Sequence, residues 1–132
     1  MLYSVQVSVL ANTEEVNSTH TYVKINKGVI NYIWVTFPPG CAGFVKFRMY
    51  VGGHPFLPVN KDAYIRGDNY TYQFPVYEEV EEAPGILTIE AWSEGSSYNH
   101  TLSFQILILP KWVVYPSLII SQAIEGLARV FA

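Results

Sequence analysis

The first residues to weigh in this sequence are those whose side chains could bind a metal. The histidines are His20, His54 and His100, and the one cysteine, Cys41, lies in the separate segment PPGCAG. No pair of them has a metal-ligand spacing such as H-x-x-x-H, which zinc sites use to bring several ligands together. We therefore predict no zinc site, and we expect the histidines to lie on strands or at the surface.

Cys41 could instead act as a nucleophile paired with a histidine. The segment around it predicts no strand-turn-helix elbow, and no helix N-terminus is predicted nearby to lower the pKa of its thiol. We interpret Cys41 as a small loop residue packed beneath a sheet, and we predict no catalytic residue in the chain. A small hydrolase that uses Cys41 is the least favoured of three functional hypotheses.

A dense group of carboxylates lies in the segment YEEVEEAPG. Its members are Glu78, Glu79, Glu81 and Glu82. With Asp62 or Asp68 they could supply oxygen ligands for calcium, but they lack the alternating D-x-D-x-D-G pattern of a dedicated calcium loop. We predict a solvated acidic loop, with calcium binding at Glu78–Glu82 left open.

Length and composition limit the possible functions. The chain has 132 residues, of which half are apolar and 14% are charged, so one domain with one core is expected. The formal net charge of −3 argues against nucleic acid, whose phosphates need clustered Lys and Arg. A single cysteine excludes an internal disulfide. The start, MLYSVQVSVL, alternates and has no basic region, so we expect no secretory signal.

Alternation of apolar and polar residues predicts β-strands along most of the chain. The segments YSVQVSV and FVKFRMYV alternate strictly, with Val45, Phe47 and Met49 on the face expected to meet the core. The segment VINYIWVTF is apolar on both faces, which indicates a central strand. Asn26-Lys27-Gly28 predicts a tight turn before it.

Further strands are expected in the segments TYVKI, AYI, YTYQFPV, ILTIEAW and HTLSFQILIL. The stretch from Gly52 to Asp68 is rich in Gly and Pro, and apart from AYI we expect it to be irregular. About eight short strands without a helix between them predict an all-β antiparallel sandwich over residues 1–110, Ig-like or jelly-roll-like, with a small barrel as the alternative.

Residues 111–132 have a helical rather than a strand pattern. Pro116 suits a first helical turn, and an apolar stripe follows at spacings of four, three and four. The stripe consists of Ile120, Ile124, Leu127 and Phe131. A helix this short must dock in order to persist, either on its own sandwich or on a neighbouring subunit. Glu125 and Arg129 argue against a membrane span.

Aromatic residues give a second set of candidate contacts. Trp112 to Tyr115 add apolar surface before the predicted helix, and Tyr70, Tyr72 and Phe74 share one face of YTYQF. Such a row could contact another protein, stack on sugars, or belong to the core. We predict the following interface residues: Trp112, Tyr115, Ile120, Ile124, Leu127, Phe131, Tyr70 and Tyr72.

The segments KGVINYIWVTFPPGCAGFVKFRMYVGGHPFLPVN, YIRGDNYTYQF and AWSEGSSYNHTLSFQILILP resemble small all-β proteins of tailed viruses and proviruses of prokaryotes. The resemblance extends from about Lys27 to Pro110 and excludes the tail. It implies a structural role in a virion, as a capsid decoration, adaptor or tail protein. It contains no catalytic motif, so it assigns no residue a role.

These observations favour a non-enzymatic structural subunit of a homo-oligomer or of a viral capsid or tail. The alternative is a carbohydrate-binding or adhesion module built on the same sandwich. Neither hypothesis requires a cofactor, a metal or nucleic acid.

Overall fold

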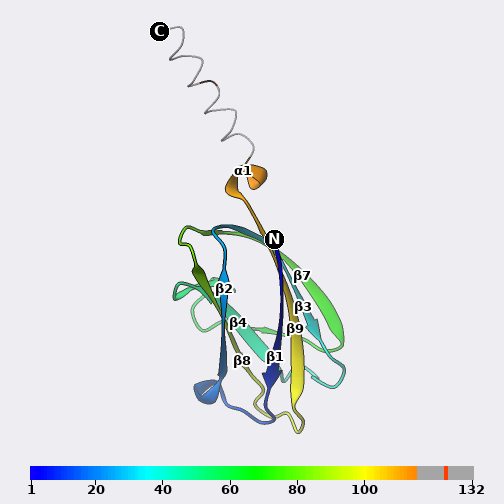
Figure 1. Ribbon diagram of the computed structural model, residues 1–132. Coiled ribbons are helices and arrows are strands. Elements are labelled where there is room, and N and C mark those ends of the chain that lie inside the picture. The colour runs from blue at the N-terminus through cyan, green and yellow to red at the C-terminus, as the bar shows by residue number, and fades with distance from the viewer. Residues whose placement is uncertain (116–123, 125–132) are drawn as a thin grey trace.

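The computed structural model describes residues 1–115 and Ile124, and within them it contains nine strands and two short helices (Figure 1). The strands are β1 (Leu2–Val9), β2 (Thr19–Ile25), β3 (Gly28–Phe37), β4 (Lys46–Val51), β5 (His54–Leu57), β6 (Ile65–Arg66), β7 (Tyr70–Val80), β8 (Gly85–Trp92) and β9 (His100–Leu109). The helices are η1 (Glu15–Asn17) and α1 (Lys111–Val114). Ile120, Leu127 and Phe131 of the predicted stripe lie outside the described residues.

The strands form two antiparallel sheets. One has the order β1-β9-β3-β7, and the other has the order β2-β8-β4-β5, with β6 paired to β4. The pairs β1·β9, β2·β8, β3·β7 and β4·β5 are nested inside one another along the chain. This nesting is the topology of a jelly roll, so the predicted all-β sandwich is confirmed in its jelly-roll form.

Most connections cross from one sheet to the other. The turn at Asn26-Lys27-Gly28 therefore joins β2 of one sheet to β3 of the other and does not form a hairpin. At its end, Gly28 lies so close to β9 that a Cβ on it would be 2.6 Å from the backbone oxygen of Leu109. Only glycine permits that approach.

The core lies between the two sheets and follows the alternation in the sequence. Val45, Phe47 and Met49 are fully buried, as predicted. The rings of Phe47 and Phe104 meet edge to face across the core, with centroids 5.1 Å apart. The segment predicted to be central is β3, and it lies between β9 and β7.

Two sequence predictions were wrong. The stretch from Gly52 to Asp68 contains β5, whose four residues include Pro55 and are too few to show a clear alternation. The predicted acidic loop is shorter than expected, because β7 continues through Glu78 and Glu79 to Val80. The backbone is irregular here: Tyr77 has a φ of 52°, and the pairing with β3 shifts between Ile30 and Tyr32. Burial still alternates through this stretch, but the half-buried position after Val76 is taken by the charged Glu78, so the apolar–polar pattern in the sequence stops before the strand ends.

Candidate binding surfaces

The residues first considered for chemistry are not gathered into a site. Among the described residues, no group of three or more His, Cys, Asp or Glu side chains is placed to hold a metal ion. Cys41 is fully buried, and burial, helped by the negative charge of Asp68, raises the pKa of its thiol to about 11. A buried, protonated thiol is a poor nucleophile.

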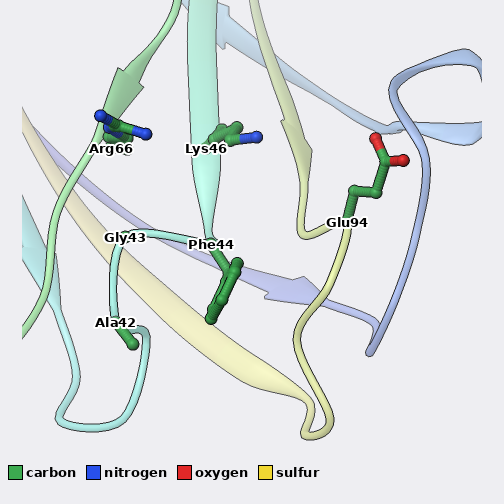
Figure 2. Close-up of a pocket in the computed structure, with 6 residues that line it drawn as sticks. All are labelled: Ala42, Gly43, Phe44, Lys46, Arg66 and Glu94. Atoms are coloured by element: carbon green, nitrogen blue, oxygen red, sulfur yellow. The ribbon is translucent and has the colours of Figure 1, made fainter.

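A recess with a volume of about 540 Å³ lies beside β4. Figure 2 shows Phe44 below it, with Lys46 between Arg66 and Glu94 in this view. Lys46 and Arg66 face each other in the β4·β6 register, and the ammonium of Lys46 is 5.1 Å from the ring centre of Tyr64. Because Glu94 also lines the recess, the charges are mixed, and the site is not a dedicated anion site.

The outer face of the five-stranded sheet carries a buried ion pair. Arg48 of β4 donates from Nε to Oε2 of Glu90 on β8 and from Nη2 to Oε1, both at 2.9 Å. Ser18 and Tyr50 also donate to this carboxylate, at 2.7 and 3.0 Å. The guanidinium of Arg48 lies 4.8 Å from the ring centre of Trp92, and its Nη1 donates to Glu15 at 2.7 Å.

The ionisation of this group follows from its contacts. Burial raises the pKa of Glu90, but the hydrogen bonds from Arg48, Ser18 and Tyr50 outweigh it, so the pKa lies below its ordinary value. The bond to Glu90 raises the pKa of Arg48. A carboxylate whose two oxygens accept four hydrogen bonds has no free acceptor for a reacting proton. We interpret the pair as a structural feature that fixes β4, β8 and the start of β2.

The outer face of the four-stranded sheet differs in charge from that of the five-stranded sheet. Residues 2–8, 32–36, 71–75 and 101–107 contain no Asp, Glu, Lys or Arg. Around Trp34, outward side chains from four strands line a depression of about 270 Å³. We call this surface the charge-free face, formed by Ser4, Gln6, Trp34, Thr36, Thr71, Gln73, Ser103 and Gln105, with Tyr32 adjoining.

Trp34 lies at the middle of the charge-free face. It is flanked by Gln105 on β9 and Gln73 on β7, which are its direct partners in the sheet register. Its indole stacks on Tyr32, with ring centres 5.7 Å apart and planes at 27°. Beside it, the hydroxyls of Thr36 and Thr71 are hydrogen-bonded at 2.9 Å. Trp34 was not among the predicted site residues, although the absence of charge in the four strand segments around it is visible in the sequence.

The predicted aromatic row on β7 is divided between core and surface. Tyr72 is half-buried and meets Phe37 edge to face, with ring centres 5.7 Å apart. Phe74 also packs against the core. Tyr70 is 61% exposed. Tyr70 alone of the three thus offers most of its surface for contact, and the interface role of Tyr70 and Tyr72 stays a prediction.

The tail begins with α1, which lies at one end of the sandwich (Figure 1) and carries exposed apolar side chains. Trp112 on the single-turn helix α1 is 56% exposed, and Val113 is 40% exposed. Leu2 is exposed at the same end, where it pairs with Leu107 near the end of β9. We call Leu2, Trp112 and Val113 the apolar end. An ion pair between Lys111 and Glu79, at 3.4 Å, links α1 to β7.

Two further predicted interface residues of the tail differ in their exposure. Tyr115 is half-buried, and Ile124 is 60% exposed. Within the described part of the chain, no helix combines the length and apolarity needed to cross a bilayer.

Fold and surfaces together define a jelly-roll β-sandwich with two unlike outer faces. No protein-family model and no curated protein matches the chain. Among solved structures, a chain of the cyanophage Pam1 capsid matches with a TM-score of 0.53 and 7% identity, over 80% of this chain and 81% of that one. At this identity, the likeness shows a shared fold.

Two further solved structures match with lower scores. A subunit of Bacillus endospore appendages, which form disulfide-linked pili, has a TM-score of 0.40 and 12% identity, over 84% of this chain and 88% of that one. The CBM36-1 domain of a multidomain xylanase from the hindgut metagenome of Trinervitermes trinervoides has a TM-score of 0.42 and 9% identity, over 81% and 86%.

Proposed function

We propose that the chain is a non-enzymatic structural subunit that assembles with further copies of itself, as a capsid decoration, adaptor or tail protein of a virion. The observation that carries this proposal is the apolar end. An indole and two aliphatic side chains are exposed at the end of the sandwich where the last strand ends. Exposed groups of large apolar side chains are typical of protein–protein contacts, where Trp is enriched.

Two further features support the proposal. The jelly-roll topology is common in viral capsid domains, although lectin domains and cupins use it too. The fold is also shared with the Pam1 capsid chain. Cys41 is buried, and Arg48 and Glu90 are engaged with each other.

The test compares the mass in solution of the full chain with that of a variant carrying Trp112→Ser and Val113→Ser. Light scattering after size-exclusion chromatography should give the wild type a multiple of 14.9 kDa. The variant should shift toward a single chain, while its melting temperature stays close to that of the wild type because both side chains are exposed.

Tyr98→Ser is the matched control, since Tyr98 is an aromatic residue that is 74% exposed outside the apolar end. It should leave the mass unchanged. A wild type that remains a single chain at every concentration would overturn the proposal, and so would a variant that assembles like the wild type.

A further inference from the structure

We propose that the charge-free face is a binding site for an uncharged oligosaccharide. This function is separate from assembly, because the face lies on the outer side of the four-stranded sheet and includes none of the residues of the apolar end.

The two outer faces of the sandwich differ in charge. The face of the five-stranded sheet carries His20, Lys24, Lys46, Arg48 and Glu90. The four strand segments of the other face carry no charged residue. A polyanion such as single-stranded nucleic acid needs a positively charged groove, so this face does not suit it. The complementary ligand is neutral.

The polar groups on the charge-free face are of a kind that suits a sugar. Its amides and hydroxyls, from Gln73, Gln105, Ser4, Gln6, Ser103, Thr36 and Thr71, each contain both a donor and an acceptor. A sugar hydroxyl also donates and accepts, so each of these groups can form a hydrogen bond with a sugar either as donor or as acceptor. Among the described residues, one hydrogen bond joins two of these side chains, that between Thr36 and Thr71. The glutamine amides beside Trp34 are exposed to solvent.

The aromatic rings of the charge-free face are placed to pack against a sugar ring. Trp34 and Tyr32 are only half-buried, and their stacked rings lie between the polar rows. An indole face offers a flat apolar surface on which the C–H groups of a pyranose ring can pack, while flanking polar groups fix its orientation. Three gaps between four strands, at about 4.8 Å each, give a width of roughly 14 Å. This width accommodates more than one sugar ring.

A subunit interface fits this surface less well. The buried centres of protein interfaces are enriched in aromatic residues, Met and Arg and are depleted in Ser. The charge-free face has Ser4, Ser103 and three glutamines around one indole. An ordinary solvent-exposed sheet face would be expected to carry charged side chains, as the other sheet does.

The test uses the full chain on an array of neutral and anionic glycans, followed by calorimetry with the neutral oligosaccharide that binds best. Trp34→Ala should weaken that binding at least tenfold. The double variant Gln73→Ala and Gln105→Ala should do the same without disturbing the fold, because both side chains are exposed. Trp112→Ala is the matched control and should bind like the wild type. The affinity should be the same at low and high salt, since no ion pair forms.

Several outcomes would overturn this inference. One is that the chain binds no neutral glycan. Another is that it binds only anionic glycans and that high salt abolishes this binding. A third is that both the Trp34 variant and the Gln73/Gln105 variant still bind the neutral glycan like the wild type. A change in assembly mass in the Gln73/Gln105 variant would instead identify the face as a subunit contact. If the Trp112/Val113 variant keeps the assembly mass of the wild type, that result contradicts the proposed assembly but not the proposed binding of an oligosaccharide.

Discussion

Arg48 and Glu90 are joined by two parallel hydrogen bonds of 2.9 Å on the outer face of the five-stranded sheet. Each side chain is mostly buried, with 12% and 8% of its surface exposed. Desolvation of the two charges therefore opposes formation of the pair. The two parallel hydrogen bonds, together with the hydrogen bonds that Ser18 and Tyr50 donate to Glu90, compensate for that penalty. Removing one partner leaves the other as an unpaired, poorly solvated charge.

We expect Arg48→Ala to lower the free energy of unfolding by roughly 3–5 kcal/mol, the range measured when one member of a buried pair is removed. Urea unfolding at pH 7 measures this loss. Lys46→Ala is the control on the same strand and the same face, because the structure shows a cation–π contact of Lys46 with the ring of Tyr64 but no ion pair among the described residues. Equal effects of the two substitutions would contradict the prediction.

The same pair predicts a dependence of stability on pH. The pKa of Glu90 is lower in the folded chain than in the unfolded chain, so its stabilisation is complete above the unfolded value, near 4.5, and is lost as pH falls through the folded value. Between pH 7 and pH 3 the wild type should lose more stability than Glu90→Gln. Glu82→Gln, in an exposed loop, is the control and should follow the wild type. Parallel curves for wild type and Glu90→Gln would show that Glu90 does not contribute.

Gly28→Ala should destabilise the fold more than Gly52→Ala. Both glycines have a positive φ, but a Cβ at residue 28 would lie 2.6 Å from Leu109 O, whereas a Cβ at residue 52 would meet nothing within 4 Å. We expect a loss of about 1 kcal/mol for Gly52, the usual strain of a non-glycine residue at such a φ, and a larger loss for Gly28. Thermal melts compare the two. A smaller loss at Gly28 would mean that β3 and β9 separate without difficulty.

Cys41 should be unreactive in the folded chain. Its thiol is buried, and its pKa of about 11 leaves almost no thiolate at pH 8. Alkylation by iodoacetamide at pH 8, followed by mass spectrometry, should be slow in buffer and rapid in denaturing urea. Modification at the same rate in both conditions would show that the PPGCAG loop opens readily.

The sequence predicted most of the strands because burial alternates with the sequence in β1, β4 and β9. It did not predict β5, which has only four residues, and it ended β7 too early, because the charged Glu78 lies at a half-buried position where the alternation calls for an apolar residue. The sequence also did not predict which strands pair with one another. Nothing in the turn at Asn26-Lys27-Gly28 distinguishes a hairpin from a crossing between sheets.

The candidate surfaces were less predictable than the fold. The segment VINYIWVTF was predicted to be a central strand because it is apolar on both faces, and its position in the sheet is indeed central. However, a sandwich covers only one face of each sheet, so Tyr32 and Trp34 remain half-exposed on the other. The Arg48–Glu90 pair joins strands that are distant in sequence, and spacing alone could not reveal it.

The nested order of the strand pairs has a consequence for how the chain folds. The innermost pair, β4·β5, closes over a short turn, whereas the outermost pair brings Leu2 against Leu107. Because closing a longer loop costs more entropy, the inner pairs should form first and the outer pairs last. Domains dominated by such distant contacts fold in milliseconds to seconds. During synthesis, β1 and β3 therefore remain without the partner that lies between them until β9 has left the ribosome.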